Sequence, residues 1–159
     1  MDNEGIIISG ATPEEWEPAM ELAWKTFLKF EALEYGEEGT AHFLDFISDE
    51  KLFKMFMAGE YKLAVAKENG KIVGLVSLRS QNHISLLFVD EAFHKRGIGK
   101  KLLAYAQDEF LFPSDFRLSV NAAPYAIDFY KKVGFMESSE LQKADGITFL
   151  PMMCFEKIV

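Results

Sequence analysis

The sequence predicts an α/β (α+β) fold, in which a mixed, mostly antiparallel sheet of about six or seven strands is flanked by about four helices. In several segments apolar residues recur at spacings of three and four, which is typical of amphipathic helices. Between these segments lie short apolar runs bounded by turn residues, which are typical of strands. The expected order is β-α-α-β-β-β-α-β-α-β-β. The 159 residues suit a single domain over 1–159.

The N-terminal part predicts a strand followed by helices. Gly5–Ser9 is a short apolar run, and Thr12-Pro13-Glu14-Glu15 is typical of a helix start, with a capping threonine and acids at the positive end of the dipole. The residues that follow predict an apolar helical stripe that packs in the core: Trp16, Met20, Ala23, Phe27 and Phe30. The glycines of 36–39 break this pattern, so we expect a second helix from about Thr40 and a short helical piece over 52–57.

The middle of the chain predicts an antiparallel meander. Two apolar runs, 63–66 and 72–78, flank Asn69-Gly70, a dipeptide that favours a two-residue hairpin turn. A third run over 84–89 follows a polar turn. The rest of the chain predicts a helix over about 97–110, a strand over 116–120, a helix from Pro124 to a cap at Gly134, and strands near 135–143 and 152–158.

Composition excludes several classes of protein. The net charge of −8 makes nucleic acid a poor partner, because a basic surface carries most of that affinity. No apolar run reaches the about 20 residues that span a bilayer, so we expect no membrane partner. Met1–Glu4 lacks the features of a signal peptide and there is one cysteine, so we expect a cytoplasmic protein without an intrachain disulfide. The His and Cys residues show no metal-ligand spacing, so no metal is expected.

The charges are unevenly placed along the chain. Residues 1–60 carry a net charge of −10, and residues 61–159 carry +2. This asymmetry is either a plain solvated surface or a division of labour, in which the acidic part attracts a cationic acceptor and the other part an anionic cofactor.

The clearest chemical signal is the segment 94–101, His-Lys-Arg-Gly-Ile-Gly-Lys-Lys, between a strand and a helix. Gly97 and Gly99 allow a tight turn and a close approach of the backbone to a ligand. The first amides of the helix offer a phosphate site at the positive end of its dipole. A Walker A loop would need a hydroxyl residue where Lys101 stands, and a dinucleotide fingerprint would need a third glycine. A basic, solvated helix start is the alternative.

His94-Lys95-Arg96-Gly97-Ile98-Gly99 resembles the acetyl-CoA motif of the GNAT N-acetyltransferases, Gln/Arg-x-x-Gly-x-Gly/Ala, with His94 in place of the usual Gln or Arg. A second motif of the family is similar to Phe129-Tyr130-Lys131-Lys132-Val133-Gly134-Phe135. The two motifs have the expected separation, and the resemblance covers about residues 60–135. It implies acceptor-side helices over 1–60, an acetyl-CoA-binding core over 61–135 and C-terminal strands over 136–159.

The resemblance also implies roles for single residues. The backbone of Leu87-Phe88-Val89 would pair with the pantetheine arm and polarise the thioester carbonyl, and the two central strands would splay beyond it to admit the cofactor. Amides from Lys95 to Lys100 would hold the pyrophosphate, and Asn121 would contact the cofactor or ordered water. Tyr130 would protonate the leaving thiolate, unless it is only a core tyrosine.

The expected reaction is a direct attack of a primary amine on acetyl-CoA in a ternary complex, and the expected acceptor is a small cationic amine. Glu31 and Glu34, at the end of the first helix, could bind this amine or act as the base, unless they form only a solvated helix end. His83 shares a face with Ser85 and Leu87 on simple alternation, unless a bulge reverses it. It is a further candidate base or a plain strand-edge histidine.

Two other functions stay open: a CoA-binding sensor or interaction module without turnover, and a protein acetyltransferase that acts on a peptide N-terminus or a lysine. Many members of the family dimerise, so a homodimer is compatible with the sequence, which identifies no interface. A longer acyl-CoA is also compatible as the donor.

Overall fold

The computed structural model describes residues 5–159; Met1–Glu4, on which the expectation about a signal peptide rests, lies outside them. The strands of this part of the chain are β1 (Ile6–Gly10), β2 (Lys62–Glu68), β3 (Lys71–Arg79), β4 (His83–Val89), β5 (Leu118–Ala122), β6 (Met136–Glu137), β7 (Gln142–Ala144) and β8 (Ile147–Cys154). The α-helices are α1 (Trp16–Phe30), α2 (Ala32–Ile47), α3 (Glu50–Met57), α4 (Ile98–Phe110) and α5 (Ile127–Val133). Three short 3-10 helices are η1 (Pro13–Glu15), η2 (Glu91–Phe93) and η3 (Pro124–Ala126).

The predicted fold class is confirmed. The sheet has the order β1-β2-β3-β4-β5-β8-β6, with β7 paired to β8, and every pairing is antiparallel except that of β4 with β5. One buried cluster packs between the sheet and helices α4 and α5, and a second packs between the sheet and helices α1, α2 and α3. No helix within residues 5–159 is long and apolar enough to cross a bilayer.

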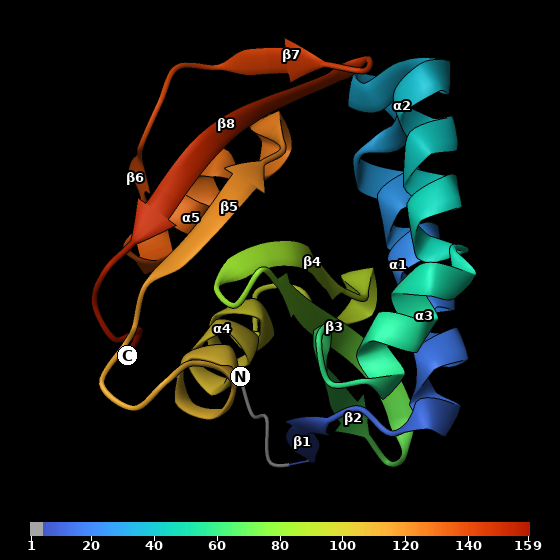
Figure 1. The fold of residues 1–159 in the computed structure, drawn as a ribbon, viewed down its shortest axis with the longest axis vertical. Coiled ribbons are helices and arrows are strands. Elements are labelled where there is room, and N and C mark those ends of the chain that lie inside the picture. Colours follow the sequence, from blue (N-terminus) through green and yellow to red (C-terminus); the bar gives the residue numbers. More distant parts are fainter. Residues whose placement is uncertain (1–4) are drawn as a thin grey trace.

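The centre of the sheet opens between β4 and β5. These strands pair only at His83 with Ser119 and at Ile84 with Val120. Beyond these two pairs the strands diverge, and Figure 1 shows β5 and β8 turning away from β4. The backbone of β4 from Leu86 to Val89 therefore has a strand partner, β3, on one side only.

A β-bulge lies in β4 beside this opening. Ser77 pairs with Leu86 and Leu78 pairs with Ile84, so Ser85 has no partner in β3. As a result, Ile84 packs in the α4–α5 cluster while Leu86, two residues on, packs in the α1–α3 cluster. The expectation that His83 shares a face with Leu87 is therefore wrong.

The elements differ from prediction mainly at glycines. The span labelled α2 begins at Ala32, but Gly36 has a non-helical backbone (φ 69°, ψ −174°) and divides it into two helical segments. The predicted break at 36–39 is therefore confirmed, and the segment beyond it begins before Thr40. The expected strand over 135–143 is split into β6 and β7. The last strand begins at Ile147, because Asp145 and Gly146 (φ 54° and 80°) form a tight hairpin turn that was not predicted.

Candidate active site

A pocket of about 430 Å³ lies where β4 and β5 diverge. Its walls come from both strands and the end of β3, from the α1–α2 junction, α2 and α5, from η3 and from the β7–β8 hairpin. Several predicted site residues line it together: Glu31, His83, Leu87, Phe88, Asn121 and Tyr130. The fold thus gathers residues of the predicted acceptor side and of the predicted cofactor side around one cavity.

Glu31 lies at the junction of α1 and α2, and only 8% of its surface is exposed. Burial raises the pKa of its carboxyl from 4.5 to about 7; a hydrogen bond with Tyr35 opposes this shift and the charge of Glu34 adds to it. Glu34 itself is exposed and is not among the pocket residues. Glu31 therefore exchanges its proton near neutral pH, as a general base must.

Tyr130, on α5, is 5% exposed and lines the same pocket. Its hydroxyl forms no hydrogen bond with any other residue of the described chain. Burial, and next the charge of Glu31, raise its pKa, so the hydroxyl remains protonated at neutral pH. A buried donor without a protein partner is free to bind a ligand in the pocket.

Two further tyrosines surround the glutamate. Tyr35 and Tyr125 line the pocket, and burial followed by the charge of Glu31 raises the pKa of both hydroxyls. Sequence reasoning gave Tyr125 no role. Its pocket neighbours come from α1 and α2, and no local spacing could have shown this.

His83 lies at the end of the pocket where β4 begins. Its Nδ1 is 2.8 Å from the Ser119 hydroxyl, across the strand pair at which β4 and β5 still meet. Burial, and next the charge of Arg79, lower the pKa of His83, so the ring is neutral at pH 7. Arg79 also lines the pocket and was missed as a site residue.

The glycine-rich turn forms an open helix start. Gly97 has a φ of 75°, and a Cβ added there would meet no atom within 4 Å. The Lys101 amide donates to the Gly97 carbonyl at 3.0 Å, so the amides of residues 98–100 lie in the first turn, where a helix offers no partner. These amides could hold a phosphate. Gly99 has a packing role as well, since a Cβ there would lie 3.1 Å from the Phe129 ring.

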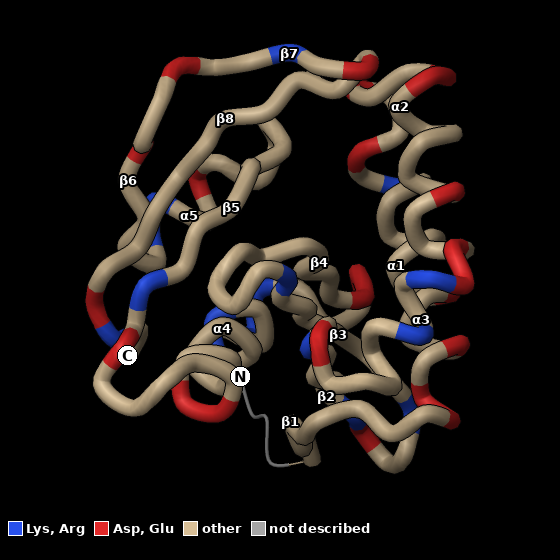
Figure 2. The backbone as a smooth tube through the Cα atoms, viewed as in Figure 1, with Lys and Arg blue, Asp and Glu red and all other residues tan. Residues whose placement is uncertain are grey.

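Basic side chains surround this turn. Lys95 (φ 64°) and Lys100 are exposed, while Arg96 lies 4.0 Å from Glu68 and over the Phe93 ring. Helix α2 carries acids and no Lys or Arg, whereas Lys and Arg positions surround the start of α4 (Figure 2). Acidic and basic positions are mixed in α1 and α3, so the acidic part of this surface is centred on α2.

The side chain of His94 points away from the helix start. Its Nε2 donates to the Val89 carbonyl at 2.7 Å, and its ring lies 5.1 Å from the Phe30 ring. Val89 itself is not among the pocket residues. His94 thus joins the glycine-rich turn to the end of β4 and to the end of α1, and Phe30 is not the core residue that the helical stripe predicted.

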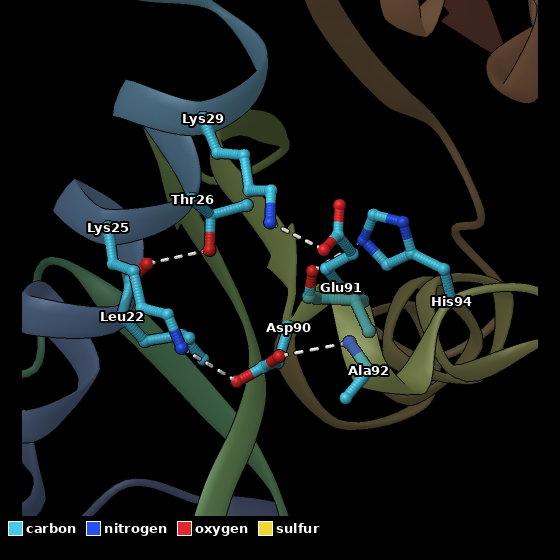
Figure 3. Close-up of polar contacts among 9 residues, drawn as sticks. Leu22, Lys25, Thr26, Lys29, Asp90, Glu91, Ala92 and His94 are labelled. Atoms are coloured by element: carbon cyan, nitrogen blue, oxygen red, sulfur yellow. Dashed lines mark hydrogen bonds and ion pairs between the residues drawn. The ribbon is translucent and has the colours of Figure 1, made fainter.

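Two ion pairs join α1 to the segment before the turn (Figure 3). Lys25 lies 3.3 Å from Asp90, and Lys29 pairs with Glu91. Asp90 also accepts a hydrogen bond from the Ala92 amide at 3.0 Å. Burial tends to raise the pKa of Asp90, but the Ala92 amide and Lys25 together hold it below its ordinary value.

A set of metal-ligand types lies at the mouth of the pocket. The ligand atoms of Glu38, His42 and Asp145 lie within 4.8 Å of one another, and all three side chains are exposed. Such a set could hold a cation. The sequence did not reveal it, because Asp145 comes from the β7–β8 hairpin and the other two residues come from α2.

Solved structures share this fold. A GCN5-related N-acetyltransferase from Rhodopseudomonas palustris has a TM-score of 0.79 at 20% identity and covers 98% of this chain and 99% of its own. PaiA N-acetyltransferase from Thermoplasma acidophilum, solved with coenzyme A, has a TM-score of 0.71 at 20% identity and covers 95% and 99%. YjaB from Escherichia coli has a TM-score of 0.70 at 24% identity and covers 93% and 96%.

Sequence comparison identifies the family. No curated protein sequence matches the chain. The model of the acetyltransferase (GNAT) domain matches residues 31–155, which include the pocket, the glycine-rich turn and most of the sheet. The chain therefore belongs to the GNAT acetyltransferases, enzymes that use acetyl-CoA and acetylate amine acceptors.

Proposed function

We propose that this enzyme transfers the acetyl group of acetyl-CoA directly to a small cationic primary amine, with both substrates bound at once. The observation that carries the proposal is the pairing, in one pocket, of a buried glutamate whose pKa lies near 7 with a buried tyrosine whose hydroxyl has no partner in the described chain. A proton acceptor and a proton donor in one cavity are what amine acetylation requires.

The described residues fit acetyl-CoA, which supplies an activated acetyl thioester. The amides of residues 95–100 and the charges of Lys95, Arg96 and Lys100 would hold the pyrophosphate at the open helix start. The unpaired edge of β4 over Leu87–Val89 would bind the pantetheine arm, with Asn121 on the opposite strand. The left-handed Gly97, whose missing side chain leaves open space, supports this assignment.

Glu31 takes the proton from the acceptor amine in this proposal. It is buried, it lines the pocket, and Tyr35 holds it by a hydrogen bond. Glu34 contributes through its charge, which raises the pKa of Glu31. His83 is the alternative base, since it is neutral at pH 7, but its Nδ1 is engaged with Ser119.

Tyr130 donates a proton to the departing thiolate. Its hydroxyl remains protonated, and its burial against Phe129 and Phe135 fixes the ring. The position of both groups in one cavity supports direct transfer without an acyl-enzyme. Cys154 is buried in the core and is not among the pocket residues.

The acceptor pocket favours a cation. Glu31 can form a charge-assisted hydrogen bond with an ammonium group, and the rings of Tyr35, Phe43 and Tyr125 offer faces to it. A spermidine N-acetyltransferase chimera from Vibrio cholerae has a similar fold, with a TM-score of 0.64 at 16% identity. Polyamines and other small amines therefore lead the acceptor screen.

The test has two steps. Calorimetric titration with acetyl-CoA, with CoA and ATP as controls, should show that acetyl-CoA and CoA bind with dissociation constants in the micromolar range and that ATP does not bind. Release of free CoA is then followed with a panel of small amines and with peptides. Binding of acetyl-CoA without turnover of any amine or peptide would contradict the transferase assignment and favour a silent CoA-binding module. Turnover of peptides alone would contradict the small acceptor.

A further inference from the structure

The last two turns of α1 are joined to the segment 90–94 by three contacts, and Figure 3 shows the two ion pairs among them. Lys25 and Lys29 are one helical turn apart and reach Asp90 and Glu91, respectively. Phe30 follows, and its ring lies 5.1 Å from that of His94. Consecutive turns of one helix therefore contact consecutive residues of one loop.

The two sides of this junction have different roles in the proposed reaction. On the loop side, His94 donates to the Val89 carbonyl and leads directly into the glycine-rich turn. On the helix side, Phe30 directly precedes Glu31, whose amide donates to the Phe27 carbonyl at 2.8 Å. Glu31 is thus one residue from a contact with the cofactor loop.

Phe30 also contacts the opposite wall. Its ring stacks on that of Tyr125 at 5.9 Å with an interplanar angle of 9°. His94 follows β4, and Tyr125 follows β5, so Phe30 lies between the segments that leave the two diverging strands. The end of α1 therefore contacts segments on both sides of the proposed cofactor site.

We infer that Lys29, Glu91, Phe30 and His94 are positioning residues that couple the cofactor turn to the end of α1, so that binding of acetyl-CoA orders the segment carrying Glu31. The inference rests on the proposed function, because it assigns the turn to acetyl-CoA and the base to Glu31. The Lys29 and Glu91 side chains are 54% and 52% exposed. Such a pair contributes little to folding stability, so its removal separates a positioning role from a structural one.

Hydrogen exchange of backbone amides, with and without saturating acetyl-CoA, tests this coupling. In the wild-type protein we expect protection at residues 94–101 and also at residues 27–35. In Lys29→Glu and in Glu91→Lys, protection of 94–101 should persist while the added protection of 27–35 is lost. The double reversal, Lys29→Glu with Glu91→Lys, should restore it, since the ion pair re-forms with opposite polarity.

Lys131 and Glu137 provide the matched control. They form an exposed pair at 3.2 Å, with 50% and 54% of their side chains exposed, and neither lines the pocket. Reversing either charge should leave the protection of both segments unchanged. Once an acceptor amine has been identified, kcat can be measured as well. Lys29→Glu should lower kcat by about tenfold and leave KM for acetyl-CoA nearly unchanged, because the positioning of Glu31 is lost and the affinity for the cofactor is not.

The possible outcomes separate the two proposals. Full protection of 27–35 in the single reversals, or a double reversal that fails to restore it, would overturn the coupling while leaving the cofactor site intact. Absence of protection at 94–101 in the wild-type protein would contradict the cofactor site itself, and the coupling with it.

Discussion

At the residue scale, burial distinguishes Glu31 from the exposed acids around it. Glu34, three positions on, is solvent-exposed, whereas Glu31 faces a pocket lined by three tyrosines. Loss of hydration disfavours the charged form, and this is the largest cause of the raised pKa. A single side chain can therefore serve as a base at neutral pH, and the shift has a measurable consequence for folding.

The first prediction concerns stability and pH. The carboxyl of Glu31 has a pKa of about 7 in the folded protein and an ordinary value of 4.5 when unfolded, so the folded state binds more protons between these values. The contribution of Glu31 is fully present below the lower value and is lost as pH rises through the upper one, by roughly 3 kcal/mol at most.

Urea unfolding at a series of pH values checks this prediction. The free energy of unfolding of Glu31→Gln, relative to the wild-type protein, should increase as pH rises across this window. Glu34→Gln is the matched control, and its difference from the wild-type protein should vary much less with pH. If the free energies of unfolding of the wild-type protein and of Glu31→Gln changed with pH in the same way, the pKa of the Glu31 carboxyl would not be raised in the folded protein.

The second prediction concerns the proposed acid. Tyr130→Phe removes only the hydroxyl, which has no hydrogen-bond partner in the described chain, so the fold should be unaffected. We expect kcat to fall by roughly a hundredfold, as for loss of a general acid. The affinity for acetyl-CoA, measured by calorimetry, should stay within about twofold. Equal kcat values in the variant and the wild-type protein would refute the acid role.

Family resemblance anticipated the identities of Glu31 and Tyr130 but not their surroundings. Tyr125 and Phe30 were missed for different reasons. Tyr125 meets Glu31 only through long-range packing. Phe30 continues the apolar stripe of α1, and periodicity cannot tell a stripe that ends in the core from one that ends against neighbouring segments, here at His94 and Tyr125.

At the element scale, Gly97 and Gly99 of the glycine-rich turn have different roles, and the third prediction compares substitutions at the two positions. Gly97→Ala adds a side chain at a positive φ that points into open space, so we expect acetyl-CoA to bind about tenfold more weakly and the backbone strain to lower stability by about 1 kcal/mol. Gly99→Ala places a methyl group 3.1 Å from the Phe129 ring, so its main effect should be a loss of about 1–3 kcal/mol in stability.

Calorimetric titration with acetyl-CoA measures the affinity of both variants, and thermal unfolding measures their Tm. If Gly97→Ala bound acetyl-CoA as tightly as the wild-type protein, the turn would not be the pyrophosphate site. If Gly99→Ala kept its Tm, α4 and α5 would adapt more easily than the packing indicates.

The fourth prediction concerns the bulge in β4. The buried Tyr61 hydroxyl lies 2.6 Å from the Ser77 hydroxyl and 3.0 Å from that of Ser85, the unpaired residue of the bulge. Tyr61→Phe leaves both serines short of a partner, so the free energy of unfolding should fall by about 1–3 kcal/mol. Tyr105→Phe is the control, since the described chain shows no hydrogen bond of that hydroxyl. Equal losses in the two variants would contradict this role of Tyr61.

Elements whose conformation depends on neighbouring residues could be predicted from the sequence, whereas elements that depend on distant segments could not. Asn69 and Gly70 both have a positive φ, as the predicted hairpin turn requires. The bulge at Ser85 could only be left open, because it depends on pairing with β3 and on Tyr61. The break predicted at Gly36 is present as a kink between two helical segments, whereas the short segment that begins at Ala32 was not predicted.

At the scale of the whole molecule, the sheet opens in the middle and places the two substrates on different parts of the chain. The proposed acceptor-side residues come from the α1–α2 junction and from α2, which carries acids but no Lys or Arg, and the proposed cofactor turn lies among basic residues at the start of α4 (Figure 2). The sequence could predict this charge division. The divergence of β4 from β5 was expected only from the family resemblance and is confirmed by the pairing, which ends after Ile84 and Val120. Composition and periodicity could not show it, because it depends on pairing between distant segments.

The central claim is that Glu31 removes the proton of the acceptor amine. The most direct test is the pH dependence of kcat, measured by CoA release from about pH 5.5 to about pH 9 with saturating substrates. The account predicts that kcat of the wild-type enzyme rises with pH through an ionisation near 7, and that Glu31→Gln loses this step together with most of its activity. A Glu31→Gln enzyme with the same kcat and the same pH profile as the wild-type enzyme would contradict the claim and shift the search for the base to His83.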